Sequence, residues 1–204
     1  MDIKRTFDQV GSAAGLIVLS PVFAIVSAVG AINFKTNPFY STERIGKDGK
    51  PFNMIKFRSM SDNKDAEGHL LPDDMRLTQW GKFIRATSID ELPQMLNVIK
   101  GDMSLVGPRP RSRSEKIPPG CESILAARPG ITGPWQVAVI GAIDSSSEEK
   151  RNKLDAAYVQ ERSGMLGDLA ILVKTVPALV LGHDGESLSG KKGGQEPANS
   201  LNIE

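Results

Sequence analysis

A tract near the N-terminus, from Val10 to Ile32, contains no ionisable side chain. As a helix rising ~1.5 Å per residue it is long enough to cross a hydrocarbon layer of ~30 Å. A cleaved signal peptide is disfavoured, because the apolar run is long and no clear small-residue cleavage site follows it. The tract therefore predicts a helix inserted in a membrane, and a buried core helix is a distant third choice behind the two membrane arrangements considered next.

A Ser20-Pro21 pair lies near the middle of this tract. Pro21 leaves the carbonyl of Ile17 without its helical partner and forces a kink, and the Ser20 hydroxyl can satisfy the freed backbone group. Composition alone favours a straight anchor and a re-entrant hairpin about equally. Basic residues flank both ends of the tract, and the positive-inside rule places both flanks in the cytosol; they are Lys4, Arg5, Lys35, Arg44, Lys47 and Lys50.

The composition excludes several functional classes. A formal net charge of +1 and an aromatic content of 5% give no polyanion-binding signature, so we expect no nucleic-acid partner. The single cysteine, Cys121, rules out an intrachain disulfide and a cysteine-rich zinc site. His69 and His183 stand in polar, turn-like surroundings and are read as surface residues. Common zinc-protease, P-loop and serine-hydrolase motifs are missing from the sequence.

The periodicity predicts a mostly α-helical α/β domain with little strand. A turn at residues 47–50 precedes a strand-like run from Phe52, and the apolar stripe of the last helix suits an interfacial or a core position. After Gly182 the chain has little to bury and is expected to be a disordered tail. A short helix is predicted within residues 75–87, and further helices over residues 92–100, 148–162 and 165–181. The helix over 148–162 is expected to be amphipathic, with Leu154, Ala157 and Tyr158 on its apolar side.

The segment from Thr87 to Pro110 carries the chemistry in our interpretation. Asp90 and Glu91 are adjacent carboxylates, which can hold a divalent cation or act as a nucleophile. Guanidinium and ammonium groups neutralise phosphate oxygens. Together these are the parts of a phosphoryl-transfer site. The cationic candidates are Lys56, Arg58, Arg85, Arg109 and Arg111.

Each part of this interpretation has a structural alternative. Ser88 and Glu91 fit a helix-capping box, but Pro93 would then fall beyond the first turn of the helix, where it is costly. A helix that starts nearer Leu92 is at least as favourable in energy. Lys56 and Arg58 would point the same way on a strand, and solvated surface residues are as credible there as phosphate ligands. The Pro-Arg-Pro sequence at 108–110 also suits a stiff turn.

The order of short motifs along the chain resembles that of the bacterial sugar transferase family, and in particular its small monotopic phosphoglycosyl transferases. The resemblance covers residues 4 to 180. Its motifs are Lys4-Arg5-x-x-Asp8, Ser20-Pro21, Arg44-x-Gly46 with Lys56-Phe-Arg-Ser-Met60, Thr87-Ser-x-Asp-Glu-Leu-Pro-Gln94, Lys100-Gly-Asp-Met-Ser104, Gly107-Pro-Arg-Pro110, Arg128-Pro-Gly-Ile-Thr-Gly133 and Asp168.

The resemblance implies a compact, monotopic, membrane-associated catalytic domain on amphipathic interfacial helices. Residues 1–35 would form a re-entrant membrane helix kinked at Ser20-Pro21, residues 36–182 the catalytic domain, and residues 183–204 the tail. The protein would lie in the bacterial inner membrane with its catalytic domain on the cytosolic face. Membrane lipid would be a partner, and downstream glycosyltransferases are further candidates.

The resemblance also implies a magnesium-dependent ping-pong reaction. Asp90 matches the nucleophile and Glu91 its dyad partner, and both are the candidate ligands of Mg²⁺. The donor would be a UDP-sugar, the acceptor polyprenyl (undecaprenyl) phosphate, and the released nucleotide UMP. Lys56, Arg85, Arg109 and Asp168 match positions lining the phosphate and metal region.

The chain departs from the family pattern at Thr42, at Pro134 and after Val137, where Ala-Val-Ile-Gly-Ala replaces the usual Gly-Arg. These positions bear on donor recognition, so the sequence does not name the sugar. Two other functions stay open. A non-catalytic membrane-anchored scaffold or regulator of polysaccharide assembly would have no need of the clustered carboxylates, and a conventional glycosyltransferase would release UDP.

Overall fold

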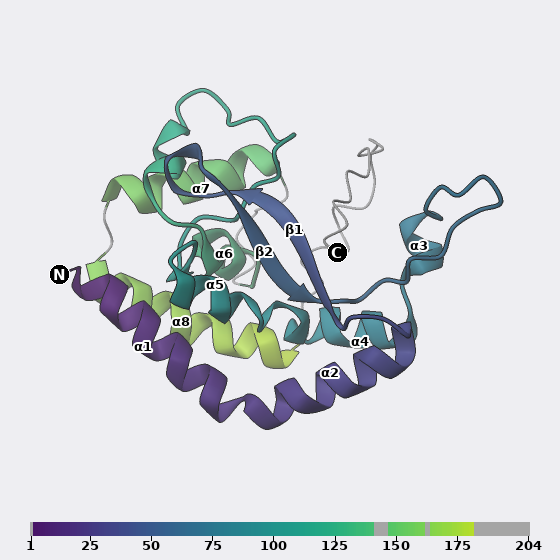
Figure 1. Cartoon of the computed structure of the whole chain (residues 1–204). Helices are drawn as coiled ribbons and strands as arrows, with labels where there is room; N and C mark the ends of the chain where they lie inside the picture. Colours follow the sequence, from purple (N-terminus) through teal and green to yellow (C-terminus); the bar gives the residue numbers. More distant parts are fainter. Residues whose placement is uncertain (1, 141–146, 162–163, 182–204) are drawn as a thin grey trace.

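Two helices that meet at a sharp bend form one side of the molecule (Figure 1). Helix α1 (Ile3–Val18) and helix α2 (Ser20–Phe34) are bent by 65° relative to each other. The bend falls where the sequence predicts a kink, and the Ser20 hydroxyl donates a 2.8 Å hydrogen bond to the carbonyl of Ile17. In the described part of the chain no single helix is long and apolar enough to cross a membrane, whereas the bent pair is compatible with a broken span or a re-entrant loop by length and composition.

The structure is a computed structural model that describes residues 2–140, 147–161 and 164–181. The tail predicted at residues 183–204 lies outside the described residues. The chain is mostly helical with two small sheets, as the sequence predicts. Its remaining elements, in order, are β1 (Phe39–Ile45), η1 (Lys47–Gly49), β2 (Pro51–Phe57), α3 (Asp73–Arg76), α4 (Gln79–Ala86), η2 (Ile89–Glu91), α5 (Gln94–Lys100), β3 (Ser104–Val106), η3 (Glu122–Ala126), β4 (Gly130–Thr132), α6 (Pro134–Ile140), α7 (Glu148–Glu161) and α8 (Gly164–Leu181).

The antiparallel hairpin of β1 and β2 lies at the centre of the fold, and strand β2 packs on both of its faces. Phe52 and Met54 contact Val98 and Met103, at α5 and just after it. Phe57, with the opposite parity, packs in a second cluster against α2 and α4. The hairpin is therefore wedged between α5 on one side and the α2–α4 layer on the other.

The short helix predicted within residues 75–87 is α4, and the one-turn helix α3 precedes it. The break lies at Leu77, which is extended (φ −74°, ψ 105°). Thr78 then starts α4 as its N-cap, because its hydroxyl accepts a 3.0 Å hydrogen bond from the backbone N–H of Gly81. The prediction of a short helix within residues 75–87 is confirmed, although the sequence pattern did not reveal its cap at Thr78.

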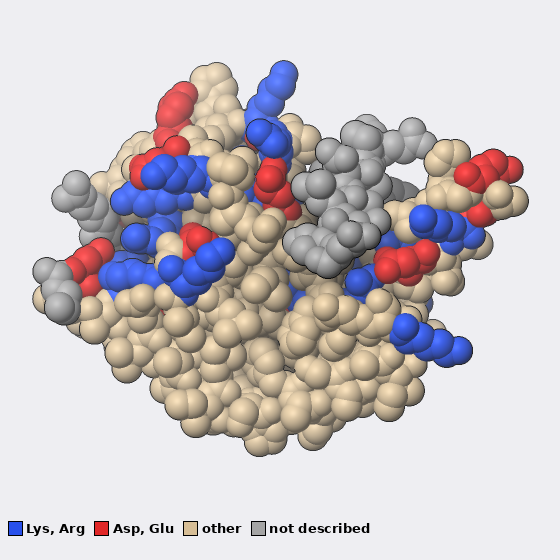
Figure 2. Space-filling view, viewed as in Figure 1, with Lys and Arg blue, Asp and Glu red and all other residues tan. Residues whose placement is uncertain are grey.

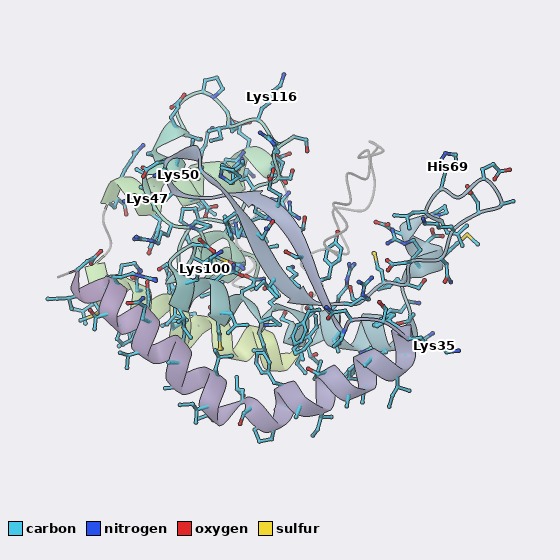
Figure 3. All side chains as sticks on the ribbon, viewed as in Figure 1. Lys35, Lys47, Lys50, His69, Lys100 and Lys116 are labelled. Atoms are coloured by element: carbon cyan, nitrogen blue, oxygen red, sulfur yellow. The ribbon has the colours of Figure 1, made fainter. Side chains whose placement is uncertain are left out.

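Residues 61–77 form an arm that projects from the body of the molecule (Figure 1). Asp62 ties the base of the arm, since its carboxylate lies 2.6 Å from the guanidinium of Arg58 and 4.0 Å from that of Arg76. Figure 3 shows His69 far out on the arm, and its side chain is 80% exposed, as expected for a surface histidine.

Between the two ends of the α1–α2 pair, the lower surface of the molecule shows no charged side chain in this view (Figure 2). Lys, Arg, Asp and Glu gather on the opposite side of this view, over the hairpin and α7. We call the exposed apolar side chains of α1 and α2 the apolar face. Its members are Ile3, Phe7, Val10, Ile17, Val18, Ile25 and Ile32, which are between 41% and 75% exposed.

Candidate functional site

The two adjacent carboxylates lie on a single 3₁₀ turn, η2, directly before α5. The predicted capping box does not form, because Ser88 is in the left-handed region (φ 53°) and its side chain makes no capping bond. Helix α5 begins at Gln94, with Pro93 at the N-cap position. The alternative of a helix starting nearer Leu92 is thus confirmed, and Pro93 sits where its missing N–H costs nothing.

Lys56 reaches the carboxylates from β2. Its ammonium nitrogen lies 2.8 Å from Oε1 of Glu91 and 3.9 Å from Oδ2 of Asp90. Asp90 is buried at 5% exposure, whereas the Glu91 side chain is 30% exposed. A buried carboxylate beside an ammonium stays charged at lower cost, which is the condition that a carboxylate nucleophile requires.

The turn that carries the carboxylates is anchored on α2. Ile89 and Leu92, on either side of Asp90 and Glu91, pack against the buried cluster of Val26, Phe57 and Ile84. Val22 and Phe23 of α2 contact the same cluster. Asp90 and Glu91 are therefore each next in sequence to a residue that packs against the cluster containing Val26 of α2.

Two of the other four predicted cations, Arg85 and Arg58, have different settings. Arg85, on α4, donates a 2.9 Å hydrogen bond from Nε to the hydroxyl of Ser59. Arg58 follows the end of β2 and donates to Asp62 and to the carbonyl of Asn37. Because the strand ends at Phe57, Lys56 and Arg58 do not share partners as two residues of one strand face would.

Arg109 and Arg111 form a second cluster with α6 and α7. Arg111 is buried and donates to the side chain of Asn152, and the backbone N–H of Arg109 donates a 3.0 Å hydrogen bond to Asp155. The guanidiniums of Arg109 and Arg151 each lie 5.7 Å from the ring centre of Trp135. These residues line a small hollow that is partly open to solvent.

Burial raises the pKa of Asp155 to about 6, although the Arg109 N–H and the charges of Arg111 and Arg109 oppose the rise. Among the described residues, Oδ1 of this carboxylate has no hydrogen-bond partner. Burial thus makes the charged form of Asp155 unfavourable.

Sequence reasoning missed Asn152 and Asp155. It expected Leu154, Ala157 and Tyr158 on the inner side of the predicted helix 148–162, but α7 buries Asn152, Asp155 and Ala156. Leu154, Ala157 and Tyr158 are partly buried, and Ala156 packs with Cys121 and Ile124, so α7 makes apolar contacts as well as the polar contacts to Arg109 and Arg111. The i, i+3 spacing of an amide and a carboxylate beside Ala156 was the available signal.

Asp168 lies in a third group, at the start of α8. Its carboxylate accepts a hydrogen bond from the ammonium of Lys4 and one of 2.5 Å from the Tyr158 hydroxyl. Burial, together with Asp168, raises the pKa of Tyr158. Asp8 extends the group by accepting a 2.6 Å hydrogen bond from Ser104. The structure thus places Asp168 with α1 and α7, and Lys56 with Asp90 and Glu91.

Asp90 and Glu91 fit a magnesium ion that takes the rest of its ligands from substrate and water. Among the described residues there is no group of three or more His, Cys, Asp or Glu side chains that could hold a metal. Mg²⁺ commonly takes one or two carboxylates and completes its shell with substrate phosphates and water. Asp90 and Glu91 match that arrangement, and a fully protein-ligated metal site does not fit the described residues.

The family model of the bacterial sugar transferases matches residues 1–182. The chain is 44% identical over 179 residues to "Uncharacterized sugar transferase EpsL" of Bacillus subtilis, with 86% of each chain covered. It is 38% identical over 204 residues to "Undecaprenyl-phosphate galactose phosphotransferase" of Salmonella typhimurium, covering 90% of this chain and 41% of the relative. It is also 37% identical over 185 residues to "UDP-glucose:undecaprenyl-phosphate glucose-1-phosphate transferase" of Klebsiella pneumoniae, covering 86% and 40%. The chain therefore spans most of the first relative and about two fifths of the other two.

Proposed function

Because the chain belongs to the bacterial sugar transferase family and is a transferase, we propose that it moves a sugar 1-phosphate from a UDP-sugar to polyprenyl phosphate and releases UMP. The observation that carries the proposal is the position of the Asp90–Glu91 pair. It is bonded to Lys56 on one side and anchored on the apolar helix α2 on the other. A soluble phosphorylated donor and a lipid-borne acceptor can meet at such a place.

The proposed reaction has two displacements at one phosphorus atom. A carboxylate oxygen of Asp90 attacks the β-phosphorus of the UDP-sugar, the bond from that phosphorus to the bridging oxygen breaks, and UMP leaves with the electron pair. A phosphate oxygen of the polyprenyl phosphate then attacks the phosphorus of the phosphosugar on Asp90, and the carboxylate leaves. The product is a polyprenyl-diphosphate sugar, and Asp90 is regenerated.

The chain's own residues supply binding and charge compensation in this scheme. The ammonium of Lys56 stands between the two carboxylates and can turn toward the diphosphate, and Arg85 is a second cation nearby in sequence. Arg109, Arg111 and Trp135 are proposed to contact the donor at the hollow they line. When bound by Asp90 and Glu91, Mg²⁺ supplies Lewis-acid neutralisation of the phosphate oxygens.

We further propose that the protein is monotopic, with α1 and α2 entering one leaflet of the bacterial inner membrane as a re-entrant pair. The apolar face is the surface that would contact lipid tails. Exposed apolar residues of α8, such as Leu166 (84%) and Val173 (63%), suit an interfacial helix. Figure 3 shows Lys47, Lys50 and Lys116 on the side opposite α1 and α2, which suits a cytosolic face.

The test is a donor-only reaction with purified protein in nanodiscs. The protein is incubated with Mg²⁺ and each member of a panel of UDP-sugars, without polyprenyl phosphate, and both nucleotide release and intact protein mass are read. The proposal expects about one UMP per protein and a phosphosugar adduct that is missing in the Asp90→Asn variant. Release of UDP would indicate a conventional glycosyltransferase, and the absence of both UMP and adduct with every donor would favour a non-catalytic scaffold.

A further inference from the structure

Asn97 is a buried polar residue on the inner side of α5. It is 1% exposed and stands directly before Val98, which belongs to the apolar core. Its side-chain oxygen accepts a 3.0 Å hydrogen bond from the backbone N–H of Ile55, and its side-chain nitrogen donates a 2.7 Å bond to the carbonyl of Asn53. The same nitrogen also donates a longer, 3.4 Å bond to the carboxylate of Asp102. A buried amide costs free energy unless it is bonded, so these contacts stabilise Asn97 in the core.

The two backbone groups that Asn97 bonds belong to the free edge of β2. Asn53 and Ile55 are alternate residues of the strand, and β2 is paired with β1 alone in a two-stranded sheet. The amide side chain offers this edge the donor and acceptor that a third strand would offer. Asn97 thereby fixes how far β2 can slide along α5.

Asn97 is itself held in place by its backbone. Its carbonyl oxygen accepts hydrogen bonds from the N–H groups of Gly101 and Asp102, both at 3.0 Å. Gly101 closes the helix in the left-handed conformation (φ 112°). The side chain of Asn97 therefore projects from a fixed point near the end of α5.

The contacts of Asn97 and of Lys56 lie next to each other on β2. Lys56 directly follows Ile55, and the carboxylates that Lys56 contacts precede α5 on the same segment that carries Asn97. Strand and segment are thus joined twice, once by the amide in the core and once by the ammonium at the carboxylates. Without the amide, the position of β2 on α5 would rest on the apolar contacts of Phe52 and Met54 with Val98 and Met103, and apolar contacts are not directional.

We propose that Asn97 is a positioning residue of the transfer reaction, which holds β2 so that the ammonium of Lys56 stands at Asp90 and Glu91. The inference rests on the proposed function for its catalytic consequence. It differs from a purely structural role, in which Asn97 would stabilise the fold without acting through Lys56.

A double-mutant cycle tests the inference. The single-turnover rate of phosphosugar adduct formation is measured by intact mass for Asn97→Ala with Lys56 present and in a Lys56→Met background. Because coupled residues are non-additive, we expect Asn97→Ala to slow adduct formation ~10- to 100-fold in the first background and less than ~3-fold in the second. Equal slowing in both backgrounds would overturn the inference.

Val98→Ala is the matched control, since it removes a fully buried side chain from the next position of the same helix without touching β2's hydrogen bonds. It should lower the melting temperature and change the adduct rate by the same factor in both backgrounds. Asn97→Ser shortens the side chain so that it loses the bonds to β2 without placing a second carboxylate beside Asp102, so it serves if Asn97→Ala does not fold. Its expected slowing again depends on Lys56.

A second readout does not require activity. The rate at which an amine-reactive ester labels Lys56 is followed by peptide mass spectrometry, with exposed Lys47 and Lys50 as internal references. Labelling of Lys56, whose side chain is 16% exposed, should rise in folded Asn97→Ala and stay unchanged in Val98→Ala. If the wild type formed no adduct, the proposed function would fail, while this labelling would still decide whether Asn97 places Lys56.

Discussion

The guanidinium of Arg5 donates hydrogen bonds to the carbonyl oxygens of Val98 and Ile99, at 2.6 and 3.2 Å, and so caps α5 from α1. Gln9, one turn further along α1, donates a 3.0 Å bond to the same Ile99 carbonyl. A cation at the C-terminus of a helix satisfies free carbonyls and complements the helix dipole. The helix that follows the two carboxylates is thus held at its far end by the helix proposed to enter the membrane.

Arg5→Ala should therefore destabilise the protein. Loss of hydrogen bonds from a charged group costs about 1.5–3 kcal/mol, and the bond from Gln9 would remain on Ile99 alone. Thermal unfolding in detergent micelles should show a lower Tm, and Arg5→Lys should recover part of the loss. Lys47→Ala, in an exposed turn, is the control, and an Arg5→Ala Tm equal to that of this control would contradict the capping role.

Asp90→Asn should abolish adduct formation and leave the fold intact. The substitution preserves shape and removes the nucleophilic oxygen charge, so the rate should fall by at least ~10³-fold. Asp73→Asn, on the exposed start of α3, is the matched control and should keep the wild-type rate. Appreciable turnover by folded Asp90→Asn would remove Asp90 from the role of nucleophile.

The raised pKa of Asp155 predicts that the free energy of unfolding depends on pH. Burial raises its pKa to about 6 in the folded protein, whereas an unfolded chain titrates near ~3.9. Between these values the folded state keeps a proton that the unfolded state has lost, so the free energy of unfolding falls as pH rises, by up to about 3 kcal/mol.

Asp155→Asn should cancel this loss. Its Tm relative to the wild type should rise between about pH 4.5 and about pH 7.5, and stay constant above that, because both states of the wild type are then ionised. Melting curves across that range make the measurement. A constant Tm difference throughout would show that the carboxyl of Asp155 titrates alike in both states.

Pro21→Ala should straighten the join between α1 and α2, because it restores the backbone N–H that can bond Ile17. A cysteine at position 2, in a Cys121→Ser background, reports which side of the membrane the N-terminus faces through labelling by an impermeant maleimide in spheroplasts. We expect cytosolic protection with Pro21 and labelling from outside with Ala. Unchanged protection would mean that the bend does not set the topology.

Chelation should stop the donor half-reaction. With EDTA in excess over Mg²⁺, neither UMP nor adduct should form, and added Mg²⁺ should restore both. Undiminished adduct formation in EDTA would remove the metal from the mechanism and leave Lys56 and the arginines as the charge compensation.

Local patterns in the sequence predicted the parts of the fold that local forces decide. Charge placement singled out Asp90 and Lys56, and the proline at position 93 favoured a helix start beyond Glu91. The hairpin turn at residues 47–50 followed from its glycine and polar residues. The helix start and the turn depend on residues that are close together in the sequence. The carboxylates and Lys56 were recognised because few structural roles explain such a grouping of charges.

The partners of the other candidates depend on contacts between distant segments, which periodicity does not contain. Lys4 and Asp168 are 164 residues apart, and Asn97 and Asn53 are 44 apart. A mid-helix asparagine among apolar neighbours is a weak signal of a buried hydrogen bond, but it does not say which backbone receives it. The same holds for Arg111, whose partner Asn152 lies on α7, 41 residues further along the chain.

The arm of residues 61–77 has a practical consequence. Its base is closed by Asp62 between two arginines, and its outer part is exposed around Gly68, where an added side chain would meet no other atom within 4 Å. An epitope or a fluorophore inserted next to Gly68 would thus be carried clear of the apolar face and of the carboxylates. The outer part of the arm is therefore a suitable place for a label with which to follow the protein.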